Sequence, residues 1–98
     1  SMRVAREKRL KKEANERHEK ELNRGVMDLY RAWLQKYKPL SDEWCDCFKA
    51  LLKAAHQVAL DQGEEDPWEY AYDVANYSVK VDETSKGWNP PGWPYYGK

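Results

Sequence analysis

The segment from Ser41 to Gly63 carries the pattern of one amphipathic helix, with a start signal and a stop signal. A serine at the N-cap accepts a hydrogen bond from the first turn, and the two acidic residues after it suit the positive end of the helix dipole. Glycine ends the helix because it adopts the left-handed conformation without steric cost. One face carries the apolar residues Trp44, Phe48, Leu51, Leu52, Ala55, Val58 and Ala59. A stripe this wide must be covered, so we expect the flanking segments to fold against it.

Length and charge set further limits. The 98 residues are enough for one domain with a limited core. The formal net charge is zero, but residues 1–38 carry twelve basic and six acidic side chains, whereas residues 39–83 carry three basic and eleven acidic ones. We divide the single domain, residues 1–98, into a charged helical arm over 1–24, a helical core over 25–83 and an aromatic, proline-rich tail over 84–98. A basic arm before an acidic body favours self-complementarity or two different partners.

The sequence predicts an all-α domain of three helices, over residues 3–38, 42–62 and 67–79. In the first helix apolar residues are sparse up to residue 21, and Gly25 marks a weak point. Pro39 ends this helix, and the short connection after it makes the first two helices antiparallel neighbours. From residue 22 onward an apolar face predicts that the helix joins the core through Leu22, Val26, Leu29, Tyr30, Trp33 and Tyr37.

The third helix begins at Pro67, and the isomer of the peptide bond before this proline has two interpretations. Asp66 as N-cap, Pro67 at the first helical position and Glu69 in a capping box mark the start. The simpler interpretation is a trans Asp66–Pro67 bond in this capping context. The alternative is a proline switch, in which a cis Pro67 redirects the helix and a host prolyl isomerase, acting there or at the tail prolines, is a partner.

The C-terminal third of the chain is rich in aromatic residues. The third helix is apolar on two sides, and only one side can cover the first two helices. In the tail from Thr84 to Lys98, prolines and glycines exclude regular structure, yet the segment carries four large aromatic residues. The tail either folds over the bundle as a lid or contacts a partner, and a docked tail can do both. The candidate partner-binding residues are Trp68, Tyr70, Val74, Tyr77, Trp88, Trp93, Tyr95 and Tyr96.

The basic arm places several cations on one helical stripe that could follow phosphates. Three interpretations stay open: DNA contact independent of sequence, a solvated helix with internal ion pairs, and docking on a protein surface. Glu13 lies inside the stripe and the following body is acidic, which weighs against DNA. The candidate contact residues are Arg6, Arg17, Lys20, Arg24 and Arg31.

Signals for a metal, catalysis or a membrane are missing from the sequence. Cys45, Cys47, His18 and His56 are suitable zinc ligands, but a C-x-C pair on a helix lacks the spacing of a structural site. No nucleophile stands in a recognised catalytic context, so we expect no enzyme activity, metal or cofactor. No apolar run is long enough for a membrane span, and no signal peptide is present, which predicts a cytoplasmic location.

Three stretches together carry a resemblance to a known family: RGVMDLYRAWLQKY, DEWCDCFKALLKAAHQVAL and the tail WNPPGWPYYGK. The chain resembles the small anti-RecBCD proteins of temperate lambdoid phages. The resemblance implies a non-enzymatic protein of the host bacterial cytoplasm that binds the RecBCD helicase–nuclease. It would alter the exonuclease and Chi-recognition activity, so that phage DNA ends survive and phage recombination is favoured. The alternative is a small DNA-binding or regulatory protein that uses the basic N-terminal helix.

Overall fold

The protein folds as three helices in the order α1 (Met2–Lys36), α2 (Asp42–Gln62) and α3 (Pro67–Ser78). The structure is a computed structural model, and it describes residues 2–79, 85 and 87–94, with the side chains of α1 described from residue 16 onward. Over these residues it contains no strand, so the prediction of an all-α fold is confirmed. The helix bounds agree with the predicted ones to within two residues.

Both caps of α2 form as the sequence predicts. The hydroxyl of Ser41 accepts a hydrogen bond from the backbone N–H of Trp44 at 3.2 Å. At the other end Gly63 has φ +72°, and its N–H donates to the carbonyl of Leu60 at 3.1 Å. The N–H of Glu64 reaches back to Ala59 at 3.0 Å, which completes a Schellman motif. All seven residues of the apolar stripe are buried, so α2 is the centre of the core.

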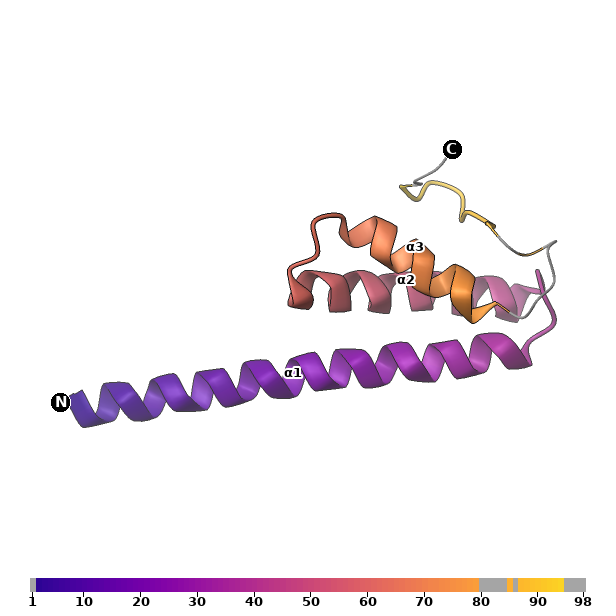
Figure 1. The fold of residues 1–98 in the computed structure, drawn as a ribbon. Helices are drawn as coiled ribbons and strands as arrows, with labels where there is room; N and C mark the ends of the chain where they lie inside the picture. The colour runs from indigo at the N-terminus through magenta and orange to yellow at the C-terminus, as the bar shows by residue number, and fades with distance from the viewer. Residues whose placement is uncertain (1, 80–84, 86, 95–98) are drawn as a thin grey trace.

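The long helix α1 lies antiparallel to α2 and extends well past it (Figure 1). It runs without a break through Gly25, so the weak point expected there does not interrupt the helix. The molecule measures 61 × 27 × 20 Å because the N-terminal part of α1 projects beyond α2 and α3. Among the described residues, no helix is both long enough and apolar enough to cross a membrane.

The face of α1 that enters the core differs from the predicted one. The helix buries Met27 and Leu34, and it packs Tyr30 partly against the same cluster. Two polar contacts hold α1 in this rotation: the Cys47 thiol reaches the Tyr30 carbonyl at 3.4 Å, and the Arg31 side chain bonds to α3. The prediction was therefore wrong for five residues, which remain 38–53% exposed: Leu22, Val26, Leu29, Trp33 and Tyr37.

Helix α3 packs across α2 and begins as predicted. The side chain of Asp66 accepts a hydrogen bond from the N–H of Glu69 at 3.1 Å, and Pro67 occupies the first helical position. Within the described residues no peptide bond is cis, so Pro67 is trans and the cis alternative is not the conformation of this structure. The inner side of α3 buries Ala71, Tyr72 and Ala75 against α2.

Candidate interaction surfaces

The described part of the tail folds back over the core as a lid. The ring of Trp88 packs edge-on against Trp44 at 5.3 Å and against Phe48 at 5.2 Å between centroids. Two hydrogen bonds join this segment to α3. The hydroxyl of Tyr72 donates to the Asn89 side chain at 2.6 Å, and the N–H of Gly87 donates to the Asn76 side chain at 3.0 Å.

Three of the predicted partner-binding residues belong to this internal aromatic cluster. Trp93 meets Trp68 edge-on at 5.6 Å, and the Lys53 ammonium lies 5.7 Å from the Trp93 ring. The ring of His56 stacks on Trp68 at 4.0 Å. Together with Trp88, these tryptophans complete the core, so the structure supports the lid interpretation for them. Tyr95 and Tyr96 lie outside the described residues.

The outer side of α3 is partly open to solvent, and we call Tyr70, Val74 and Tyr77 with the adjacent Glu69 and Asp73 the α3 outer face. Tyr70 and Val74 are half-buried against the edge of the core, whereas Tyr77 is 85% exposed. The expectation that this side of the helix lacks an internal partner is therefore confirmed for Tyr77 and was wrong for Tyr70 and Val74, which pack against the core. Tyr77 therefore presents an aromatic ring to any macromolecule that approaches α3.

The chain itself is acidic from the end of α2 through α3. Between residues 60 and 79 the chain has six acidic side chains and no lysine or arginine. Several of them surround a shallow groove of about 280 Å³ at the start of α3, which is lined by Glu64, Glu65, Asp66, Glu69, Tyr70 and Asp73. The acidic side chains of this groove favour the approach of a positively charged surface.

A second exposed apolar surface lies on α1, and we call Leu22, Val26, Leu29, Trp33 and Tyr37 the α1 stripe. These side chains follow one another along the helix at intervals of three or four residues. A groove of about 310 Å³ runs beside the first half of the stripe and is lined by His18, Glu21, Leu22, Gly25, Val26 and Leu29. The absence of a side chain at Gly25 opens this groove, since nothing stands within 4 Å of the position that a Cβ would occupy there.

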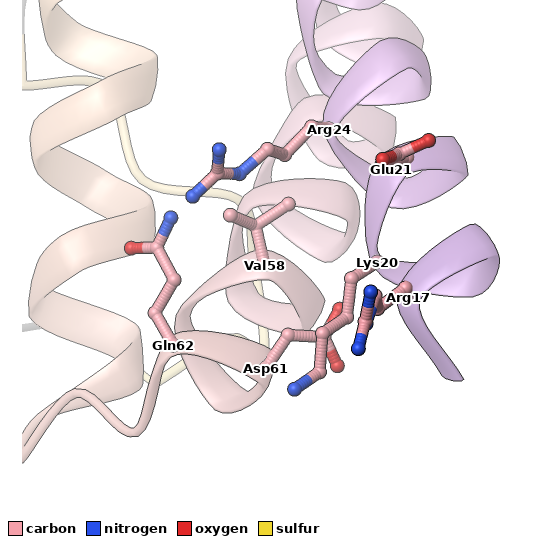
Figure 2. Close-up of a pocket in the computed structure, with 7 residues that line it drawn as sticks. All are labelled: Arg17, Lys20, Glu21, Arg24, Val58, Asp61 and Gln62. Atoms are coloured by element: carbon pink, nitrogen blue, oxygen red, sulfur yellow. The ribbon is translucent and has the colours of Figure 1, made fainter. Parts of the chain in front are cut away.

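The candidate contact residues of α1 whose side chains the structure describes divide between two places. Arg17, Lys20 and Arg24 line a pocket between α1 and the end of α2, which also contains Glu21, Val58, Asp61 and Gln62 (Figure 2). Arg31 is directed elsewhere: its Nε donates to the Ser78 hydroxyl at 3.0 Å, and its guanidinium lies 3.7 Å from Asp28. The side chain of Arg6 lies outside the described part of the structure. Three cations therefore converge, with two carboxylates among them.

The two cysteines are free thiols in an apolar setting. Burial raises the pKa of Cys47 above its ordinary value. Burial also raises the pKa of Cys45, the Lys49 ammonium lowers it, and Asp42 and Asp46 raise it further. Both groups therefore remain protonated thiols at neutral pH, which makes them poor nucleophiles. Across the described residues, no group of three or more histidine, cysteine, aspartate or glutamate side chains is arranged to hold a metal ion.

The comparisons with known proteins identify no relative. No family model, no curated protein and no solved structure matches the chain. The features that bear on function are therefore the two exposed surfaces, the basic pocket and the sequence resemblance.

Proposed function

We propose that this chain is a non-enzymatic modulator that binds the host RecBCD helicase–nuclease in the bacterial cytoplasm. By protein–protein contact it would alter the exonuclease and Chi-recognition activity and so protect phage DNA ends. The sequence resemblance supplies the partner. The structural observation that carries the proposal is the α3 outer face, which has the acidic groove at the start of α3 and the 85% exposed Tyr77 near its end.

The charge of this face matches what a helicase–nuclease must present. An enzyme that threads DNA needs positive surfaces along the path of the phosphates. An acidic protein surface is attracted to the same places, which speeds association and places the modulator near the DNA path. Tyrosine is among the residues that contribute most binding energy at protein interfaces, so Tyr77 would anchor the contact.

The helix beneath the proposed contact surface is held by core contacts, which favours binding. The inner side of α3 is held by Ala71, Tyr72 and Ala75, all fully buried, and by the tail through the bond from Tyr72 to Asn89. The outer face therefore has a fixed backbone in the free protein, and binding requires little further ordering. A substitution at Tyr77 changes this surface without removing a core contact.

A binding assay with purified RecBCD tests the proposal. We expect Tyr77→Ala to weaken binding by about 2 kcal/mol, or roughly thirtyfold in Kd, since the side chain would be a central anchor. A double reversal, Glu64→Lys with Glu65→Lys, should slow association and reduce its salt dependence. The double reversal Glu16→Lys with Asp46→Lys changes the charge equally at exposed positions of α1 and α2 and serves as the matched control.

Activity is measured in the same samples as ATP-dependent degradation of linear duplex DNA. Wild-type protein should inhibit the degradation or change its response to Chi, and Tyr77→Ala should require a higher concentration for the same effect. Failure of the wild-type protein to bind RecBCD would refute the proposal. If wild type, Tyr77→Ala and the double reversal at Glu64 and Glu65 bind equally well, the contact lies on another surface of the protein.

The pocket of Arg17, Lys20 and Arg24 favours a second candidate function, direct DNA binding. Three cations at one site can contact phosphates, but Glu21 and Asp61 in the same pocket reduce the local charge. DNA binding would weaken steeply with added salt, and it would be lost in a variant with Ala at all three basic positions. The same variant should bind RecBCD as wild type does if the α3 outer face makes the contact.

A further inference from the structure

The spacing of the α1 stripe is the spacing of a helix-pairing seam. Leu22, Val26, Leu29 and Trp33 are separated by four, three and four residues, which keeps them on one line along the helix. Their exposed fractions lie between 40% and 53%, and neither α2 nor α3 covers them. A second helix laid along this line would bury all four side chains at once.

The groove beside the stripe has the form of holes that receive side chains of a second helix. In paired helices, one side chain inserts among four residues at positions i, i+3, i+4 and i+7 of the facing helix. The residues that line the groove make two such holes, which share two members: the first is His18, Glu21, Leu22 and Gly25, and the second is Leu22, Gly25, Val26 and Leu29. Gly25 belongs to both holes, and its lack of a side chain gives them the depth to accept large residues.

Charges at the ends of the seam select the direction of the second helix. Glu19 stands three residues before Leu22, and Lys36 stands three residues after Trp33, so both continue the same line. Both side chains are exposed. In a parallel pair of identical helices, Glu19 would face Glu19 and Lys36 would face Lys36. In an antiparallel pair each glutamate faces a lysine, which replaces two repulsions by two attractions.

We propose that the α1 stripe binds a second copy of this chain, with the two α1 helices antiparallel. In this register Trp33 of one copy enters the hole that contains Gly25 and Leu22 of the other. Val26 lies opposite Leu29, and Glu19 lies opposite Lys36. The contact is the same from both sides, as the two-fold symmetry of a dimer requires.

This surface is separate from the one that carries the proposed function. The seam is on α1, whereas Tyr77 and the acidic groove belong to α3 and the loop before it. Self-association and partner binding can therefore be tested independently. Either proposal can prove wrong while the other holds.

Sedimentation velocity of the full chain over a wide range of concentration tests the association. We expect wild-type protein to approach twice its monomer mass of 11.6 kDa as concentration rises. Leu29→Glu places a charge at the centre of the seam and should give monomer throughout. Its helical circular dichroism should be unchanged, because Leu29 is outside the core. Gln35→Glu, an exposed substitution on the opposite side of α1, should leave the dimer intact.

Charge exchange then tests the register. Glu19→Lys and Lys36→Glu, each alone, should weaken the dimer by about tenfold in Kd, because each creates two like-charge pairs. Together in one chain the two substitutions should restore wild-type affinity. A wild-type chain that stays monomeric would overturn the proposal, and so would a dimer that Leu29→Glu leaves unchanged. A dimer that the double exchange does not restore would overturn the antiparallel register.

Discussion

The guanidinium of Arg31 on α1 donates a hydrogen bond to the buried hydroxyl of Ser78, the last residue of α3, at 3.0 Å. The Ser78 hydroxyl in turn donates to the carbonyl of Val74 at 2.7 Å. Helices that are far apart in the sequence are thus joined by a polar contact that also covers the end of α3. Arg31 was a candidate for phosphate contact, and in the structure its side chain has this internal role.

Replacement of Arg31 by alanine should destabilise the fold by about 1 kcal/mol, the usual net contribution of one hydrogen bond, without affecting any DNA binding. Urea unfolding followed by circular dichroism measures the loss. Lys20→Ala, an exposed substitution on the same helix, should have little effect on stability. An unchanged unfolding midpoint in Arg31→Ala would mean that the contact to Ser78 contributes nothing.

Removal of Trp88 should destabilise the protein far more, because its ring covers Trp44 and Phe48 in the core. We expect Trp88→Ala to cost about 3 kcal/mol, since truncation of a large aromatic side chain leaves a cavity. Trp88→Phe should retain part of the packing and lose less. Chemical denaturation checks both variants, and it must precede any partner-binding assay with them, because loss of the fold would imitate loss of a contact.

Two helix glycines should respond to alanine in opposite directions. Gly63→Ala should destabilise by about 1 kcal/mol because φ is +72° at this C-cap. Gly25→Ala should stabilise by up to about 1 kcal/mol, because this residue lies within a continuous helix and a Cβ there meets nothing within 4 Å. Thermal unfolding in the Leu29→Glu background measures both effects without a contribution from association. If both substitutions changed the stability in the same direction, the backbone conformations assigned to Gly25 and Gly63 would be wrong.

The turn between α1 and α2 should be improved by a change at Leu40. This residue has φ +65°, which is unfavourable for a leucine, and its side chain is 44% exposed. Asparagine tolerates this conformation, so Leu40→Asn should raise the free energy of unfolding by about 0.5 kcal/mol. Leu40→Ala is the control, because it shortens the side chain and keeps the strain. If the two variants are equally stable, strain at this position is not significant.

The buried thiol of Cys47 should make stability fall at high pH. Its pKa is raised in the folded protein, so the unfolded chain loses the thiol proton first. The stabilisation is therefore complete below the ordinary thiol pKa of 9.0 and is lost as the pH rises through the folded value. Unfolding free energies across this range should decline more steeply for wild type than for Cys47→Ala. Parallel curves would show that the Cys47 thiol ionises equally in both states.

Local signals in the sequence were sufficient to predict α2 and the start of α3. A cap is an interaction between residues a few positions apart, so Ser41, Gly63 and Asp66 specify helix ends almost independently of the remaining fold. The sequence also predicted that the apolar face of α2 is buried, because so wide an apolar face must be covered. These predictions are confirmed because nothing distant competes with them.

The rotation of α1 could not be predicted in the same way. Apolar residues surround much of the second half of this helix, and the sequence pattern does not indicate which of them α2 will cover. The choice depends on tertiary contacts at Tyr30 and Arg31, which involve residues far along the chain. For the same reason the sequence did not identify the α1 stripe as exposed, and on the α3 outer face it was right about Tyr77 but not about Tyr70 and Val74.

The lid has a consequence for the rate at which the protein folds and unfolds. Trp44 and Trp88 touch although almost half of the chain separates them, so we expect their contact to form late, after the pairing of α1 with α2. Contacts that form after the transition state affect the unfolding rate more than the folding rate. Stopped-flow measurements on Trp88→Phe should therefore show faster unfolding and almost unchanged refolding, in which case the Trp88 contact would set how long the native protein persists.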